Sequence, residues 1–378
     1  MDIVNYYGGS GNMSGSIFGK NFQISTWGES HGKALGVVID GCPAGISLSE
    51  ADIQADLDKR KPGQSPFSTP RQEDDNVEIL SGVFEGKTTG TPISLIVYNT
   101  NQRPYDYSEI SKAYRPGHAD YSYDQKYGFR DYRGGGRSSG RETTSRVAAG
   151  AVAKKILKEL NITVQAYTLS IGDIAIDKSR FDADQIYRNF LAMPDREAAD
   201  KAAAFLTQRK DEEDSAGGIV ECVVTGLPAG VGEPVFEKLD AMLGRAIFSI
   251  GAVKGVEFGN GFEAASLSGS QNNDNYRVDE NGNITKLTNN AGGIVGGISD
   301  GFPIVINAAF KPTPSIHKLQ KTVNKQGENI DIRIEGRHDP IIVPRAVIVV
   351  EAMVALTLTD YLLQRILSRM ELIKKALL

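Results

Sequence analysis

Gly41-Cys42-Pro43-Ala44-Gly45 in the first half of the chain and Gly226-Leu227-Pro228-Ala229-Gly230 in the second repeat one Gly-x-Pro-Ala-Gly turn. An apolar run that predicts a strand precedes each turn, over residues 36–40 and 218–225. Segments with helical spacing follow over residues 48–57, capped by Ser47 or Ser49, and over residues 236–243. The two copies lie too far apart for a stacked repeat. We therefore expect a duplicated α/β core whose halves share one site at their junction.

The rest of the chain predicts further short strands and a few longer helices. Strands are expected over residues 34–39, 77–86, 92–98 and 304–310, the second and third of them as a hairpin. Helices are expected from about residue 141 to 157, on the surface over 195–214, and at the end of the chain over 346–376. Residues 269–290 are rich in Asn, Gly, Ser and Asp, which predicts a long loop that is either mobile or a lid.

Composition limits the classes of function. The 378 residues allow one large α/β domain or two of common size, and 40% hydrophobic with 24% charged residues is typical of a soluble protein with a sizeable core. The net charge of −5 argues against a surface built for nucleic acid or anionic lipid. Any basic site must be local, which favours a small ligand.

The cysteines and the N-terminus bear on the compartment. Cys42 and Cys222 lie far apart, with no CxxC and no His pair at i, i+4, so neither disulfides nor a zinc site is indicated and a reducing cytoplasm fits best. The first residues lack a signal peptide, and we expect residues 1–13 to be a disordered leader. No later stretch is expected to offer the ~20 apolar residues of a membrane span. Residues 14–378 are expected to form a single domain.

Three of the four histidines, His31, His118 and His338, lie in polar turns bounded by glycine. Histidine titrates near neutral pH, so this placement suggests proton transfer. The interpretation is strongest for His118, between Arg115 and Asp120, whereas His31 alone could equally be a turn histidine that donates to a carbonyl.

In an extended Arg337-His338-Asp339 segment, Arg337 and Asp339 face the same side, so this pair is the candidate there. A surface ion pair worth at most about 1 kcal/mol is its structural alternative. His317 has no acid or glycine beside it and is expected to be structural.

The sharper signal is an arginine-rich run that opens a predicted helix, with Arg130, Arg133, Arg137, Arg141 and Arg146. Guanidinium groups, free backbone N–H groups and a helix N-terminus together suit a phosphate. The basic cluster Lys59-Arg60-Lys61 could approach from the first half. Walker A, GxGxxG and nucleophile-elbow motifs are absent from the sequence. The residues therefore predict an acid–base enzyme for a phosphorylated small molecule, with room for a phosphate-bearing cofactor.

Five ordered blocks resemble the chorismate synthase family, over residues 14–367. They are Gly28-Glu29-Ser30-His31-Gly32 with Asp40-Gly41-Cys42-Pro43, Arg115-Pro116-Gly117-His118-Ala119-Asp120, Tyr132-Arg133-Gly134-Gly135-Gly136, Gly136-Arg137-Ser138-Ser139-Gly140-Arg141-Glu142-Thr143, and Arg337-His338-Asp339-Pro340 with Glu351-Ala352-Met353. The resemblance implies a β-α-β sandwich in which antiparallel sheets enclose helices, with a pseudo-duplicated core, assembled as a cytoplasmic homotetramer.

The resemblance also implies the chemistry. The family is a carbon–oxygen lyase that removes phosphate and a ring proton from 5-enolpyruvylshikimate 3-phosphate by 1,4-anti elimination, giving chorismate in the last step of the shikimate pathway. Reduced FMN is required without net redox change, and its electron-rich ring can donate density as the C–O bond breaks. This chain has no evident flavin reductase segment, so reduced flavin would come from an external source. The resemblance also implies an association with the nucleotide NADP.

Site residues follow from the resemblance, position by position. His31 would protonate the departing phosphate, His118 would hold the anionic reduced flavin near N1 and the C2 oxygen, and Asp339, aided by Ser30, would handle the proton at flavin N5. Substrate anions would be gripped by Arg60, Arg141 and Arg337. The flavin would be held by Arg137, Ser138, Ser139, Gly251, Ala252, Gly296, Lys311, Pro312, Thr313, Pro314, Ser315 and Arg337.

The chain departs from the family pattern at Pro66, where many members have an arginine that Arg71 would have to replace, and at Pro314 and Ile341. These departures concern ligand contacts rather than the reaction. Two other classes compete with this interpretation: an RNA-binding protein, from the tract Arg133-Gly134-Gly135-Gly136-Arg137, and a phosphate-handling enzyme without flavin, such as a phosphatase or another lyase.

Overall fold

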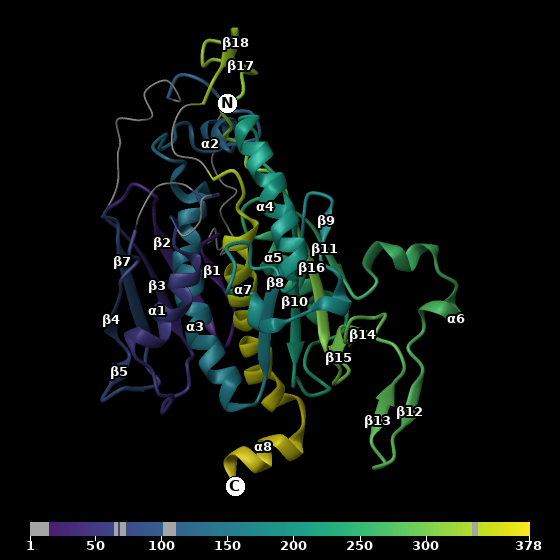
Figure 1. Ribbon diagram of the computed structural model, residues 1–378. Coiled ribbons are helices and arrows are strands. Elements are labelled where there is room, and N and C mark those ends of the chain that lie inside the picture. The colour runs from purple at the N-terminus through teal and green to yellow at the C-terminus, as the bar shows by residue number, and fades with distance from the viewer. Residues whose placement is uncertain (1–14, 64–66, 69–72, 101–110, 335–338) are drawn as a thin grey trace, which may run out of the picture.

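Two five-stranded antiparallel sheets enclose a layer of helices in the computed structural model (Figure 1). The structure describes residues 15–63, 67–68, 73–100, 111–334 and 339–378. The predicted leader, Pro66, Arg71, Arg337 and His338 lie outside these residues. The expected β-α-β sandwich is confirmed.

The first sheet has the order β1-β2-β3-β7-β4 and the second the order β11-β16-β10-β8-β9. The first consists of β1 (Ile17–Phe18), β2 (Gln23–Gly28), β3 (Ala34–Asp40), β4 (Val77–Ser81) and β7 (Ile93–Tyr98). The second consists of β8 (Thr163–Ile171), β9 (Ile174–Ala175), β10 (Gly218–Thr225), β11 (Val253–Phe258) and β16 (Ile304–Phe310). The predicted strands over 34–39, 77–86, 92–98 and 304–310 therefore exist, although the second ends at Ser81.

The repeated turn occupies equivalent places in the two sheets. β3 and β10 are each the middle strand of five, and each leads into a Gly-x-Pro-Ala-Gly turn. The backbone repeats as well: φ is +79° and +91° at Gly41 and Gly45, and +81° and +90° at Gly226 and Gly230. Only glycine adopts this left-handed region without strain. The two repeated turns therefore lead the chain out of the middle strand of each sheet in the same backbone conformation.

Between the sheets lie α1 (Glu50–Arg60), α3 (Thr143–Glu159), α5 (Leu239–Phe248) and α7 (Val343–Arg365). The side chain of Ser49 caps α1. One cluster of buried apolar side chains joins this layer to both sheets. The second predicted helix begins three residues later than expected because Lys238 keeps an extended backbone, with φ −53° and ψ 140°.

Helix α7 corrects one expectation. Its stretch Val343–Ser368 is long and apolar enough to cross a membrane by composition, contrary to the expectation that the chain has no such segment. Inside the sandwich, however, 89% of that apolar window is buried. A helix that is apolar on all sides is explained here by burial between two sheets.

The remaining elements lie around the sandwich. They are the helices α2 (Asp120–Tyr127), α4 (Arg196–Asp211), α6 (Gly269–Asn272) and α8 (Met370–Leu377), with the hairpins β5–β6 (Val83–Phe84, Lys87–Thr88), β12–β13 (Tyr276–Val278, Ile284–Lys286), β14–β15 (Ile294–Val295, Ile298–Ser299) and β17–β18 (Gln320–Val323, Asn329–Ile332). Residues 269–290, predicted as a long loop, contain the short elements α6, β12 and β13, and the expectation that they are mobile or act as a lid stays a prediction. Helix α6 and strands β12 and β13 form an arm that extends from the sandwich in Figure 1.

Close packing between α3 and α7 generates a stability prediction. A Cβ atom on Gly150 would lie 2.6 Å from the Cα atom of Ala352, so Gly150→Ala should lower the free energy of unfolding by about 1–3 kcal/mol through overpacking. The matched control is Gly244→Ala in α5, where a Cβ meets nothing within 4 Å and helix propensity alone should add up to about 1 kcal/mol. Urea unfolding compares the two variants, and equal stabilities would refute the packing argument.

Candidate active site

Segments from several parts of the chain meet at one end of the sandwich. The turn after β2 carries Ser30 and His31, the segment before α2 carries His118, and a glycine-rich loop precedes α3. Residues after β16 and before α7 complete the group, with Lys311 and Asp339. Side-chain and backbone hydrogen bonds described below connect these segments.

Three consecutive glycines separate the two catalytic candidates His31 and His118. Gly134, Gly135 and Gly136 have φ of +66°, +90° and +53°. A Cβ on Gly134 would lie 2.6 Å from Nδ1 of His31, and one on Gly135 would lie 3.0 Å from Cε1 of His118. The glycines are therefore required twice, by the backbone conformation and by the imidazole rings that lie against them.

His31 is buried, with 6% of its surface exposed. Its Nδ1 lies 3.2 Å from Oγ of Ser30, which also donates to the carbonyl of Arg133 at 3.3 Å. The turn folds against the glycine loop, which accounts for the burial of the ring. Ser30 therefore contacts His31 directly, and its predicted role of aiding Asp339 stays a prediction.

His118 is held by the acid and the arginine that bracket it in the sequence. Nδ1 of His118 lies 3.0 Å from Oδ1 of Asp120 and 3.0 Å from Nη2 of Arg115. Arg115 donates to both carboxylate oxygens of Asp120, at 2.7 and 2.8 Å. Arg115 and His118 overcome the desolvation of Asp120 and hold the pKa of its carboxyl far below the ordinary value. An ionised Asp120 favours the tautomer with the proton on Nδ1, so Nε2 faces the glycine loop as the other ring nitrogen.

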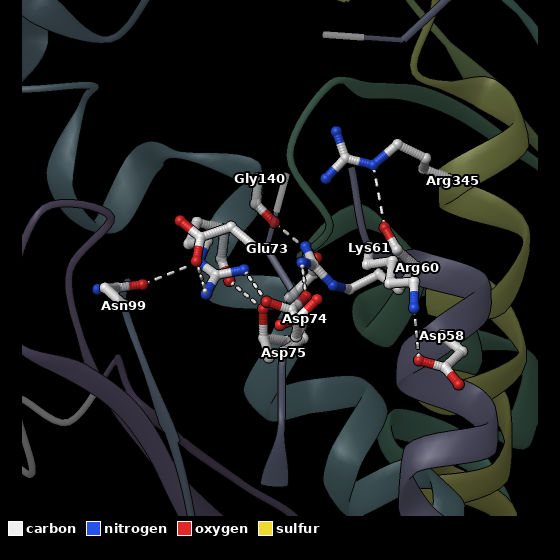
Figure 2. Close-up of polar contacts among 12 residues, drawn as sticks. Asp58, Arg60, Lys61, Glu73, Asp74, Asp75, Asn99, Gly140 and Arg345 are labelled. Carbon is white, nitrogen blue, oxygen red and sulfur yellow. Dashed lines mark hydrogen bonds and ion pairs between the residues drawn. The ribbon is translucent and has the colours of Figure 1, made fainter. Parts of the chain in front are cut away.

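Two buried arginines share one carboxylate beside the histidine turn (Figure 2). Arg60, at the end of α1, donates from Nη2 to Oδ2 of Asp75 at 2.5 Å, and Arg141 donates from Nη1 to Oδ1 of the same residue. Burial lowers the pKa of Arg60 to about 10, against the opposing effect of Asp75, so the group remains charged at neutral pH. The pKa of Asp75 is held below its usual value by both arginines despite desolvation.

This arginine pair retains hydrogen-bonding capacity. Nε and Nη1 of Arg60 and Nη2 of Arg141 are buried and find no hydrogen-bond partner among the residues that the structure describes. Buried donors of this kind are costly unless a ligand accepts from them. These N–H groups could donate to the anion that Arg60 and Arg141 are predicted to bind.

Asp339 is connected to the same cluster through an arginine that the sequence reading missed. Nη1 of Arg345 contacts Oδ2 of Asp339 at 2.6 Å, and its Nε donates to the carbonyl of Arg60 at 3.0 Å. Arg345 lies in the first turn of α7, where a cation is disfavoured by the helix dipole, and that position was a usable signal. Asp75 carried no comparable signal, because its role depends on contacts between distant segments.

Several residues predicted to hold the flavin lie in the glycine loop or near His118. Arg137 donates to Oγ1 of Thr26 at 2.8 Å, and Oγ of Ser138 donates to the carbonyl of Gly135 at 2.7 Å. Ser139 caps the 3₁₀ turn Gly140–Glu142 that leads into α3. Lys311 donates from Nζ to the carbonyl of Gly117 at 2.6 Å, next to His118.

Neighbouring backbone also belongs to this group. The backbone N–H of Lys311 donates to the carbonyl of Ala252 at 3.0 Å, which places Gly251 and Ala252 beside it. Ala252 has a φ of +72°, and a Cβ on Gly251 would meet open space. Oγ1 of Thr313 is buried without a hydrogen-bond partner among the described residues. An unsatisfied hydroxyl, a lysine and free space suit a polar ligand such as FMN, so the residues present fit this cofactor.

Other predicted residues lie apart from the group. Gly296 is in the β14–β15 hairpin near the start of α5, whereas Gly251 follows its end, and a ten-residue helix spans roughly 15 Å. Its contact with flavin remains a prediction. Three arginines of the run form local ion pairs: Arg130 with Asp124, Arg133 with Asp131, and Arg146 with Glu142. Nε of Arg130 also lies 3.6 Å from Oδ1 of Asp120, the partner of His118.

The sandwich fold, in which histidines and buried arginines are brought together from distant segments, is that of an α/β enzyme. The family profile of chorismate synthase matches residues 22–363. The chain belongs to the chorismate synthase family. It is a lyase of the shikimate pathway, which leads to the aromatic amino acids.

Relatives and a solved structure agree with this assignment. The chorismate synthase of Lachnospira eligens is 64% identical over 96% of this chain and 99% of its own length. That of Methanosarcina mazei is 54% identical over 93% of this chain and 97% of its own. A crystal structure of a chorismate synthase superimposes with a TM-score of 0.73 at 34% identity, covering 95% of this chain and 96% of that one.

The glycine loop gives a testable prediction for the site. Gly134→Ala should lower kcat roughly 10- to 100-fold, because the new Cβ displaces His31 and misplacement by about 1 Å costs that much. Gly128→Ala is the matched control: it has a φ of +77° but nothing within 4 Å of a Cβ, so it carries the backbone strain alone. Steady-state kinetics of both variants decide the matter, and an equal loss in Gly128→Ala would attribute the effect to strain.

Proposed function

We propose that this protein converts 5-enolpyruvylshikimate 3-phosphate to chorismate by 1,4-anti elimination of phosphate and a ring proton, with reduced FMN as cofactor. The observation that carries the proposal is the buried pair Arg60 and Arg141, with three donor atoms that find no hydrogen-bond partner among the described residues. A trianionic substrate supplies acceptors for such donors. Since Asp75 and Glu73 lie beside the arginines, the grip depends on directed N–H groups rather than on net charge.

Proton transfers would fall to His31 and Asp339. His31 protonates the departing phosphate, with Ser30 orienting its ring through Nδ1. Asp339 receives the proton that leaves the ring, and the bond from Arg345 fixes the direction of its carboxylate. Protonating the leaving group while the ring is deprotonated avoids build-up of charge in either direction. Arg337 would contribute a further cation to the substrate and the flavin.

The cofactor would be held by Arg137, Ser138 and Ser139, by Gly251 and Ala252, and by the loop of Lys311, Pro312, Thr313, Pro314 and Ser315. When bound, reduced FMN supplies electron density to the allylic system as the C–O bond breaks. His118 would stabilise the anionic form of the flavin by donating from a protonated Nε2, while Asp120 accepts from Nδ1 and Arg115 orients Asp120. The reduced flavin would be delivered by a separate cytoplasmic reductase.

The protein would act as a homotetramer in the cytoplasm. Trp27 and Tyr98 lie on strands of the first sheet and keep 42% and 51% of their surfaces exposed, as does Leu80 with 56%. Aromatic side chains of this kind are enriched where subunits meet. Light scattering should give four times the chain mass of 40.8 kDa, and a monomer mass would remove this part of the proposal.

The activity is tested with 5-enolpyruvylshikimate 3-phosphate under anaerobic conditions, with and without reduced FMN, following chorismate by absorbance. Turnover should require the reduced flavin. His118→Ala and Asp339→Ala should each lower turnover about 10²-fold or more, the size of a general acid–base contribution.

His317→Ala is the control, because His317 is exposed and has no place in the mechanism. Near-normal rates in both His118→Ala and Asp339→Ala would remove these residues from the mechanism. Phosphate release that does not depend on flavin would favour the competing assignment, a phosphatase or another lyase.

A further inference from the structure

Asn99 connects the histidine turn to the arginine cluster. It follows the end of β7 and keeps 8% of its surface exposed. Its Oδ1 accepts from Nε of Arg141 at 2.9 Å, and Figure 2 shows this side chain directed towards the guanidinium cluster. Its Nδ2 donates to the carbonyls of Glu29 and Gly32, at 3.1 and 2.8 Å.

Both ends of the turn are therefore fixed by one amide group. Glu29 and Gly32 flank Ser30 and His31, and the N–H of Gly32 donates to the carbonyl of Glu29 at 3.1 Å. The backbone N–H of Asn99 also donates to the carbonyl of Lys33 at 3.0 Å, just beyond the turn. An amide offers one acceptor and two donors, and all three are used here.

Other side chains of similar size cannot make this set of contacts. Aspartate would keep the acceptor for Arg141 but would place a second negative oxygen against two carbonyls. It would also add a carboxylate next to Glu73 and Asp75, whose charges already compete for the arginines. Alanine would remove all three bonds and leave two carbonyls and a guanidinium N–H unsatisfied.

We propose that Asn99 is a positioning residue that fixes the distance between the imidazole of His31 and the guanidinium of Arg141. The inference rests on the proposed function, in which Arg141 binds the substrate anion and His31 protonates the phosphate. Asn99 contacts Arg141, which binds the anion, and the turn that carries the acid His31. The two groups are therefore held in the geometry that proton transfer requires before the substrate binds. Asn99 itself does not touch the reacting atoms.

The test is a double-mutant cycle between Asn99 and His31. Asn99→Ala should lower kcat roughly 10- to 100-fold in the otherwise unchanged enzyme, as expected for a misplaced catalytic group. In a His31→Ala background the same change should alter kcat by less than about twofold, because the group it positions is gone. Asn99→Asp should lower kcat similarly and should also raise KM, since it adds a negative charge beside Arg141. If the alanine variant does not fold, Asn99→Asp takes its place in the double-mutant cycle.

Asn290→Ala is the matched control. Asn290 donates from Nδ2 to two backbone carbonyls, those of Gln271 and Asn272, in the arm away from the site. It should keep normal kcat and KM, whatever its effect on melting temperature. Equal losses from Asn99→Ala in both backgrounds, or normal kcat in both Asn99 variants, would overturn the positioning role. Normal kcat in His31→Ala would instead show that the proposed function of His31 has failed.

Discussion

Asp75 accepts hydrogen bonds from two buried arginines that arrive from different helices, Arg60 from the end of α1 and Arg141 from the turn before α3. Two guanidinium groups cannot stay buried together without a counter-charge, because desolvation and mutual repulsion both oppose it. The carboxylate meets only part of their hydrogen-bonding capacity, and three of the remaining donor atoms find no partner in the described part of the chain; these are the donors proposed to bind an anion. The position of Asp75 thus determines both the stability and the binding chemistry of the site.

Contacts extend from this carboxylate in two directions. Arg345 connects Asp339 to the backbone of Arg60, and Asn99 connects Arg141 to the turn of His31. Each connection joins a group proposed to move a proton to a group proposed to bind an anion. Rigid connections of this kind keep reacting groups within the small tolerances that catalysis demands.

The duplicated sheets contribute unequally to this site. Sequence reading found the Gly-x-Pro-Ala-Gly turns, and the structure places both after the middle strand of a sheet with matching backbone angles. The first half then supplies Arg60 and His31, whereas the second supplies Lys311 from the end of β16. Equivalent folds therefore need not carry equivalent chemistry, since the site is built from segments that leave the sheets rather than from the sheets themselves.

Local pattern alone determined strands β3, β4, β7, β10 and β16, most helices, the glycine turns and the short-range pair of Asp120 with His118, whereas β2, β8 and β11 were not predicted. Periodicity, caps and left-handed glycines act within a few residues, so a sequence reveals them directly. It also determined the family, through ordered motifs. Only the tertiary structure decided that Arg60 and Arg141 share Asp75, that Arg345 holds Asp339, and that α7 is buried instead of membrane-spanning. Asp75 lies 15 residues from Arg60 and 66 from Arg141 in the sequence, and no local rule states which buried charge will find which partner.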